Sequence, residues 1–264
     1  MDLQWRRHQG WAINATLGGD GGRFMSDELP TLDNPPEIVE LKRPLENFRA
    51  ALGRRGPVRV VAMGSSSTAG LRNVVPYPAR LELYLRKHYK DDDPHPNIRI
   101  DVFNRGQGGQ EAPLEVPRFD DDIFADNPSL VLWQVGTNAV FRQKEFNFDE
   151  VVASITRGLA LLRNHPTMDV ILIDPQYVTA MLFDDNADLA EKMVSAIRTA
   201  AEDAEVNLFQ RWALMRHWHV YNKVSFEQLL DPEDDLKLHQ SNWSTMQVSL
   251  ALTNSIIKAA TPTA

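Results

Sequence analysis

The chain has 264 residues, of which 43% are hydrophobic, and this is enough for one sizeable core. Its 28 Lys and Arg residues against 36 Asp and Glu residues give a formal charge of −8, so the composition carries no basic footprint for nucleic acid or for an anionic membrane surface. Cysteine is absent, which excludes disulfides and thiolate metal sites, and no apolar run approaches the ~18 residues of a membrane-spanning helix.

The first part of the chain, residues 1–36, is rich in Gly, Asp, Asn and Pro and lacks hydrophobic periodicity, so we expect a loose extension. It contains no apolar stretch typical of a secretory signal, and the cellular compartment stays open. Residues 37–264 are expected to form a single domain that begins with an amphipathic helix over 37–52, broken near Pro44. The sequence does not predict an oligomeric state.

From residue 58 onward, short runs rich in β-branched or aromatic residues alternate with amphipathic helical patterns. The expected strands are 58–63, 98–104, 130–136, 169–175 and 206–211. In one intervening helix, Val151, Ile155 and Leu159 recur every four residues. This alternation indicates βαβ units, and we predict a flavodoxin-like three-layer α/β/α sandwich whose five-stranded parallel sheet has the order 2-1-3-4-5.

Small and hydrogen-bonding residues follow the first three strands, at the edge where an open parallel sheet binds its ligands. The three segments are GSSSTAG (64–70), NRGQGGQE (104–111) and GTN (136–138). Their spacing differs from that of a P-loop, a dinucleotide-binding loop and the α/β-hydrolase nucleophile elbow, so no cofactor is predicted. Each segment taken alone is also typical of an ordinary turn.

Taken together, these segments favour acyl transfer, which needs a nucleophile, a base and donors that bind an oxyanion. One of the three serines could attack, while the backbone N–H groups of Ser66 and Gly109 and the carboxamide of Asn138 could bind the oxyanion. The base is expected from DPEDDLKLHQSNWS (231–244), where His239 follows four carboxylates. A histidine at such a loop-to-helix junction is otherwise a surface residue.

The four segments together resemble the four blocks of the SGNH (GDSL-like) hydrolase family. IDPQY (173–177) and ALMRHWH (213–219) are similar to a bacterial esterase subgroup of that family. The resemblance implies that Ser66 is the nucleophile and His239 the base. It further implies that Gly109 and Asn138 complete an oxyanion hole with the Ser66 N–H, and that no metal or cofactor is needed.

One position departs from the family pattern, because the usual Asp three residues before the histidine is here Leu236. We expect Asp235 to orient His239 instead, since one extra residue could bulge out of the loop. Asp234 is the second choice, and a backbone carbonyl or a water molecule is the remaining possibility.

The expected function is a serine esterase that hydrolyses small acyl esters, because the loops at the strand ends are short and have no long apolar lid. The substrate would be a small-molecule or saccharide ester, with O-acetyl groups on a saccharide as one candidate. Two alternatives stay open. One is a non-catalytic carbohydrate- or ligand-binding module with a decayed site, and the other is an acyltransferase that uses a sugar acceptor.

Four further residues have a structural explanation beside a functional one. His217 and His219 could bind a metal, but their alternating positions favour one buried and one exposed ring, and no metal site is predicted. Trp133 is expected in the core. Arg142 could touch substrate, although a solvated side chain is the simpler expectation.

Overall fold

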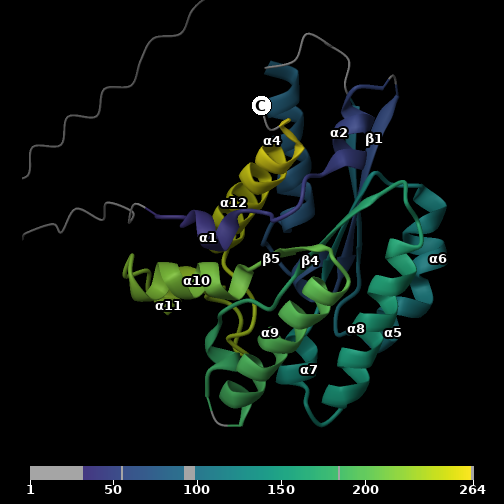
Figure 1. Ribbon diagram of the computed structural model, residues 1–264. Helices are drawn as coiled ribbons and strands as arrows, with labels where there is room; N and C mark the ends of the chain where they lie inside the picture. The colour runs from purple at the N-terminus through teal and green to yellow at the C-terminus, as the bar shows by residue number, and fades with distance from the viewer. Residues whose placement is uncertain (1–31, 55, 92–98, 184, 263–264) are drawn as a thin grey trace, which may run out of the picture.

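A single parallel sheet organises the chain (Figure 1). The computed structural model describes residues 32–54, 56–91, 99–183 and 185–262. The sheet order is β2-β1-β3-β4-β5, and every neighbouring pair is parallel. The predicted architecture and strand order are therefore confirmed, whereas residues 1–31 of the predicted extension lie outside the described residues. The strands are β1 (Pro57–Gly64), β2 (Arg99–Gly106), β3 (Leu130–Gln134), β4 (Asp169–Ile173) and β5 (Asn207–Phe209).

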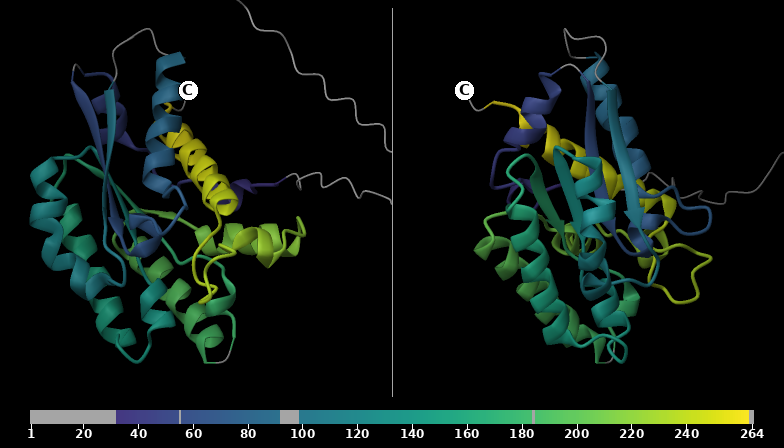
Figure 2. Two further views of the ribbon diagram at one scale, coloured as in Figure 1. Left: turned by 180° about the vertical axis from the view of Figure 1, so that it is seen from behind. Right: turned by 90° about the vertical axis from the view of Figure 1, so that its right-hand side faces the viewer.

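Helices cover both faces of this sheet (Figures 1 and 2). One face carries α4 (Tyr77–Asp91) and α12 (Asn242–Ala260), which pack against each other. The other face carries α5 (Ala112–Glu115), α6 (Phe119–Asp122), α8 (Phe148–Arg163) and α9 (Asn186–Asp203). Further α-helices are α1 (Pro36–Val39), α2 (Glu46–Leu52), α3 (Ser66–Ala69), α7 (Thr137–Phe141), α10 (Arg211–Val220) and α11 (Phe226–Leu229). Within the described ranges, no helix combines the length and apolar character needed to cross a membrane.

The helix expected over 37–52 is replaced by two short helices, α1 and α2, that lie on either side of Pro44. A proline disfavours the helical conformation of the residue before it, which here is Arg43. The backbone of Arg43 is instead held by the side chain of Asn207, whose Oδ1 accepts from the Arg43 N–H at 2.9 Å and whose Nδ2 donates to the Arg43 carbonyl at 3.0 Å. The segment is therefore anchored to β5 rather than continued as a helix.

Trp133, on β3, is fully buried, as expected, and organises the core on the side of α5, α6 and α8. Its ring meets Phe119 edge-on with 5.0 Å between the centroids, and its indole N–H donates to the carboxyl of Glu115 at 2.7 Å. Gly158 of α8 passes directly over the same ring. A β-carbon at position 158 would lie 2.4 Å from Trp133 Cη2, so a glycine is needed here for packing.

We expect Gly158→Ala to lower the free energy of unfolding by about 1–3 kcal/mol, because the added methyl group overpacks a rigid, fully buried ring. The sign is informative, since alanine in place of glycine ordinarily stabilises the interior of a helix by up to ~1 kcal/mol. Urea unfolding measures the change. Gly53→Ala is the matched control, because a β-carbon there meets only the Ala50 carbonyl at 3.8 Å. An unchanged or stabilised Gly158→Ala protein would contradict the packing described.

The buried carboxyl of Glu115 is expected to make the free energy of unfolding depend on pH. Burial raises the pKa of Glu115 to about 8, and the negative charge of Glu111 adds to the rise, while the bond from Trp133 and the charge of Arg118 oppose it. The folded chain thus keeps a proton that the unfolded chain releases near pH 4.3, so stability is lost as the pH rises from about 4.3 to about 8.

Glu115→Gln removes this titration. We therefore expect the Tm of the variant, relative to that of the parent protein, to rise between pH 5 and pH 8. Glu191→Gln, at an exposed position of α9, should show a difference that does not depend on pH. Parallel Tm curves for parent and Glu115→Gln would show that the carboxyl does not titrate in this range.

Candidate active site

The nucleophile turn (residues 64–70) and the loop after β2 are in direct backbone contact. Ser66 begins α3 immediately after β1, and the Gln107 N–H donates to the Gly64 carbonyl at 2.8 Å. Gly106 allows this approach, because a β-carbon there would lie 2.3 Å from the backbone nitrogen of Ala69. The carboxyl ends of β1 and β2 therefore bring their following loops together at one edge of the sheet.

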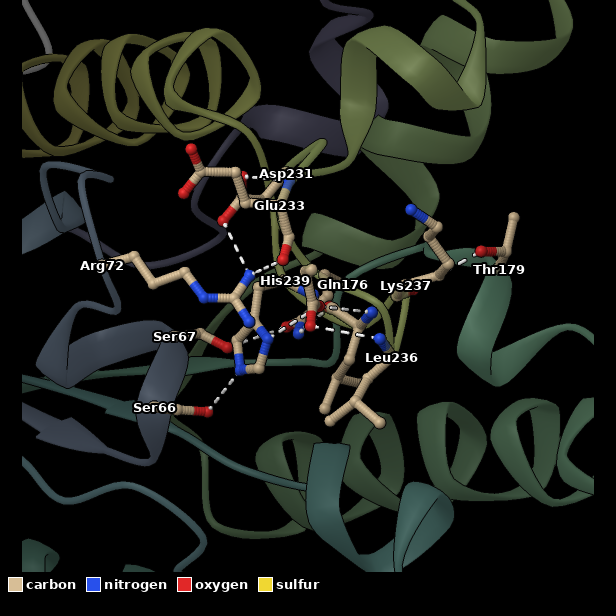
Figure 3. A network of polar contacts seen from close by, with 12 residues as sticks. Ser66, Ser67, Arg72, Gln176, Thr179, Asp231, Glu233, Leu236, Lys237 and His239 are labelled. Atoms are coloured by element: carbon tan, nitrogen blue, oxygen red, sulfur yellow. Dashed lines mark hydrogen bonds and ion pairs between the residues drawn. The ribbon is translucent and has the colours of Figure 1, made fainter.

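The base loop, residues 230–241, brings His239 to the same edge (Figure 3). The Ser66 Oγ lies 3.0 Å from His239 Nε2, which is hydrogen-bonding distance. On the other side of the ring, His239 Nδ1 lies 2.8 Å from Asp234 Oδ2. The structure thus aligns a hydroxyl, an imidazole and a carboxylate in a continuous hydrogen-bonded line.

The carboxylate in that line belongs to Asp234, and the expected Asp235 is exposed to solvent. The reason is a tight turn in which Lys237 adopts a left-handed conformation with φ of 52° and its N–H donates to the Asp234 carbonyl. Leu236, at the usual position of the family's acid, is turned outward with 55% of its surface exposed. A sequence signal for Asp234 existed, because Asp side chains often accept bonds from backbone N–H groups of the turn that follows them.

Asp234 is almost fully buried and well supplied with donors. Its Oδ2 accepts from the backbone N–H groups of Leu238 and His239 at 2.9 and 2.8 Å, in addition to the His239 ring. Burial alone would raise the pKa of Asp234, but these hydrogen bonds together hold it below its ordinary value. The acid is therefore ionised at neutral pH and can fix the orientation of the imidazole.

The base loop is closed like a hairpin and tied to the nucleophile side. An isolated antiparallel bridge joins Leu230 and Gln240, and the Asp231 N–H donates to the His239 carbonyl at 3.0 Å. Arg72, which follows α3, donates to the Glu233 carbonyl and lies 3.7 Å from the Asp231 carboxylate. The last residue of the loop, Ser241, caps α12, so the loop is also fixed at its C-terminal end.

The loop that carries Gly109 reaches Ser66, because a β-carbon on Gly108 would lie 3.9 Å from Ser66 Cβ. Gly109 has φ of 79°, a left-handed conformation that favours glycine. Asn138, in α7, donates one of its two amide hydrogens to the Gln110 carbonyl at 2.8 Å, which leaves the other hydrogen for a ligand. Within the described residues, the backbone N–H groups of Ser66 and Gly109 donate to no protein group.

Glu111, the last residue of the NRGQGGQE segment, holds these donors together. Its buried carboxylate accepts from the N–H groups of Ala112, Gly136 and Ala139 at 3.1, 2.8 and 3.1 Å. The loop that carries Gly109 and the turn that carries Asn138 are thus joined by one side chain. The sequence had assigned no role to Glu111, although a glutamate next to a glycine-rich loop is an available acceptor for such N–H groups.

Arg142 lies beside the loop that carries Gly109. Its guanidinium atoms lie 3.6–3.7 Å from where a β-carbon on Gly109 would be, and its Nη1 pairs with Glu145 at 3.3 Å. His217 and His219 both lie on α10 and are half-buried, so the expected contrast between a buried and an exposed ring is absent. His217 lies 3.5 Å from the Asp33 carboxylate, whereas His219 contacts the Val224 carbonyl at 2.8 Å. No group of three or more metal-ligating side chains occurs among residues whose positions are described.

A small cavity of about 20 Å³ opens beside the Ser66–His239 pair. Its apolar wall comes from Leu71, Val74 and Pro76, and the rest of its lining is Ser67, Gly70, Gln240 and Thr245. This volume corresponds to roughly one water molecule. A larger hollow of about 380 Å³ lies at the opposite edge, where β1 begins, and includes none of the aligned residues. Ligands of open parallel sheets bind at the carboxyl ends of strands, where the small cavity includes Ser66 and His239. A hollow of about 650 Å³ lies beside α7 and is lined in part by Arg142.

Comparison with solved structures supports the fold. The alanine variant of a catalytic serine in Axe2, an acetylxylan esterase from Geobacillus stearothermophilus, matches with a TM-score of 0.57 and 19% identity over 77% of this chain and 94% of that chain. Catalytic mutants of an aspartate and of a histidine in Axe2 match as well. A protein of Desulfitobacterium hafniense assigned to the G-D-S-L family of lipolytic proteins gives a TM-score of 0.59 and 20% identity over 75% of this chain and 99% of that chain.

Comparison with curated protein sequences gave no match. The sequence profile of the Non-GDSL lipase-like family, in contrast, matches residues 32–262, which include the whole sheet and every aligned residue described above. The chain therefore belongs to the Non-GDSL lipase-like family.

Proposed function

We propose that the chain hydrolyses small acyl esters, with O-acetyl groups on a saccharide as the preferred class, through a Ser66–His239–Asp234 triad. Its family and fold make it a carboxylic ester hydrolase of the SGNH type. The observation that carries the proposal is the line of hydrogen bonds from Ser66 Oγ to His239 Nε2 at 3.0 Å and from His239 Nδ1 to Asp234 at 2.8 Å.

The geometry supports a two-step mechanism. His239 Nε2 takes the proton of Ser66 Oγ as the oxygen attacks the ester carbonyl, and Asp234 stabilises the resulting imidazolium. The imidazolium then gives its proton to the departing alcohol, which leaves an acyl-Ser66. Water attacks this ester with His239 again as the base, and the acid product leaves while Ser66 regains its proton.

The negative charge that develops on the carbonyl oxygen in both steps needs donors fixed in advance. The backbone N–H groups of Ser66 and Gly109 and the free amide hydrogen of Asn138 are suited to this role, since none of them is consumed by a protein contact in the described part of the chain. The carboxylate of Glu111 keeps the two loops that carry these donors in register.

The small cavity supports a short acyl group. With about 20 Å³ and an apolar wall of Leu71, Val74 and Pro76 beside the Ser66–His239 pair, it suits an acetyl methyl group better than a long alkyl chain. The saccharide part of the proposal is supported by the similarity of the fold to Axe2, an acetylxylan esterase.

The alternative of a decayed, non-catalytic site was based on the missing acid at position 236. Asp234 weakens that argument, because a buried carboxylate contacts His239 after all. Transfer of the acyl group to a sugar would use the same serine and histidine. Analysis of the products formed with and without an added oligosaccharide distinguishes hydrolysis from transfer.

Covalent labelling tests the proposal directly. We expect a fluorophosphonate to label the parent protein, and Ser66→Ala to lose both labelling and hydrolysis of p-nitrophenyl acetate. Ser65→Ala should still be labelled, because the Ser65 hydroxyl faces Gln134 in the interior. Across a series of p-nitrophenyl esters, kcat/KM should fall as the acyl chain lengthens. Labelling of Ser66→Ala would refute Ser66 as the nucleophile. A higher kcat/KM for long acyl chains would refute the proposed acyl specificity.

Asp234→Asn should lower kcat by roughly 10²–10⁴-fold, because the amide cannot stabilise the imidazolium and turns an N–H toward His239. Asp235→Asn is the matched control one residue away, and we expect its kcat to stay within a few-fold of the parent value because the side chain is exposed. Circular dichroism and Tm check that both variants fold. Equal kcat values for the two variants would remove Asp234 from the mechanism.

A further inference from the structure

Gln176, in the loop after β4, lies between the nucleophile turn and the base loop (Figure 3). Its side chain is fully buried. Its Oε1 accepts from the hydroxyls of Ser67 and Thr137 at 3.3 and 3.4 Å, and its Nε2 donates to the Leu238 carbonyl at 3.1 Å. Each of these three partners is the immediate chain neighbour of a residue placed in the reaction.

Each hydrogen-bond partner of Gln176 is adjacent in the chain to a different residue of the proposed mechanism. Ser67 follows the nucleophile, Thr137 precedes the oxyanion donor of α7, and Leu238 precedes the base. A single carboxamide therefore contacts the backbone segments that carry attack, charge stabilisation and proton transfer. No other side chain among the described residues has hydrogen bonds to all three segments.

The orientation of the amide is fixed by the carbonyl it meets. Leu238 presents only an acceptor, so Nε2 must face it, whereas a hydroxyl can donate to Oε1. Gln134 extends the network on the nucleophile side. Its Oε1 accepts from Ser65 and Thr68, and its Nε2 donates to Thr137, whose hydroxyl in turn donates to Gln176.

Resting on the proposed function, we propose that Gln176 is a positioning residue that sets the distance between Ser66 Oγ and His239 Nε2. The two atoms belong to segments 173 residues apart in the chain, and their contact is 3.0 Å. Burial makes the link of Gln176 strong, because its polar atoms cannot exchange their partners for water. The other link described between these segments, through Arg72, is 37% exposed and is therefore weaker.

The experiment compares Gln176→Met with Gln134→Met. Both variants replace a buried carboxamide by a side chain of similar length, but only Gln176 contacts the base loop. We expect Gln176→Met to lower kcat on p-nitrophenyl acetate by about 10–100-fold with KM nearly unchanged, as for a displaced catalytic pair. Gln134→Met should lower kcat several-fold less while reducing Tm by a similar amount.

The ring ¹⁵N chemical shifts of His239 give a second readout that needs no ester. In Gln176→Met they should move toward those of Ser66→Ala, whereas Gln134→Met should keep the parent values. If the parent protein cleaves no ester, the proposed function fails, yet the ¹⁵N shifts still decide whether Gln176 sets the Ser66–His239 contact.

Gln176→Glu is a near-isosteric variant that keeps the test valid if Gln176→Met does not fold. When protonated, the new carboxyl can donate to the Leu238 carbonyl, and when ionised it opposes that carbonyl. We therefore expect the kcat of this variant relative to the parent to fall as the pH rises through the carboxyl pKa, which burial raises. Equal losses of kcat in Gln176→Met and Gln134→Met, unchanged His239 shifts in Gln176→Met, or a pH-independent ratio for Gln176→Glu would each overturn the proposal.

Discussion

One oxygen atom, Oδ2 of Asp234, accepts the hydrogen bonds that both fold the base loop and hold its imidazole. It takes the N–H groups of Leu238 and His239 and the His239 ring nitrogen. The loop conformation and the orientation of the imidazole are therefore coupled. Loss of the Asp234 carboxylate would remove the hydrogen bonds that hold the turn and the bond that holds the ring. If the carboxylate came from a distant segment, other acceptors would be needed for the backbone N–H groups of the loop.

The parallel sheet supplies the other half of the arrangement. Because β1, β2 and β3 end at one edge, the turn at Ser66, the loop at Gly109 and the helix at Asn138 meet without any long connection. Backbone contacts made possible by Gly106 and acceptors supplied by Glu111 then fix these three segments to each other. What the sheet does not position is the base loop, which is why buried side-chain contacts to it matter.

The sequence was sufficient wherever the deciding interactions are local or follow from the topology. Hydrophobic periodicity predicted the five strands, and their alternation with helices fitted a doubly wound sheet of the observed order. The family resemblance singled out Ser66 and His239, which the structure places in contact. Counting along the chain misidentified the acid, because the left-handed turn at Lys237 carries Asp234 inward and leaves Asp235 in solvent. The segment IDPQY (173–177) entered only as part of the family resemblance and gave Gln176 no role, because the partners of its side chain belong to three segments distant in sequence. The break near Pro44 was predicted, but the link between Arg43 and Asn207 was not, because these two residues are remote in sequence.

The order of these segments along the chain has a consequence for biosynthesis. A ribosome releases Ser66, Gly109 and Asn138 well before His239, and the last residue of the base loop, Ser241, caps α12, which packs on α4. A nascent chain that has completed β5 therefore already contains Ser66, Gly109 and Asn138 but lacks His239 and Asp234. The contact between Ser66 and His239 therefore forms only after the whole sheet has been synthesised.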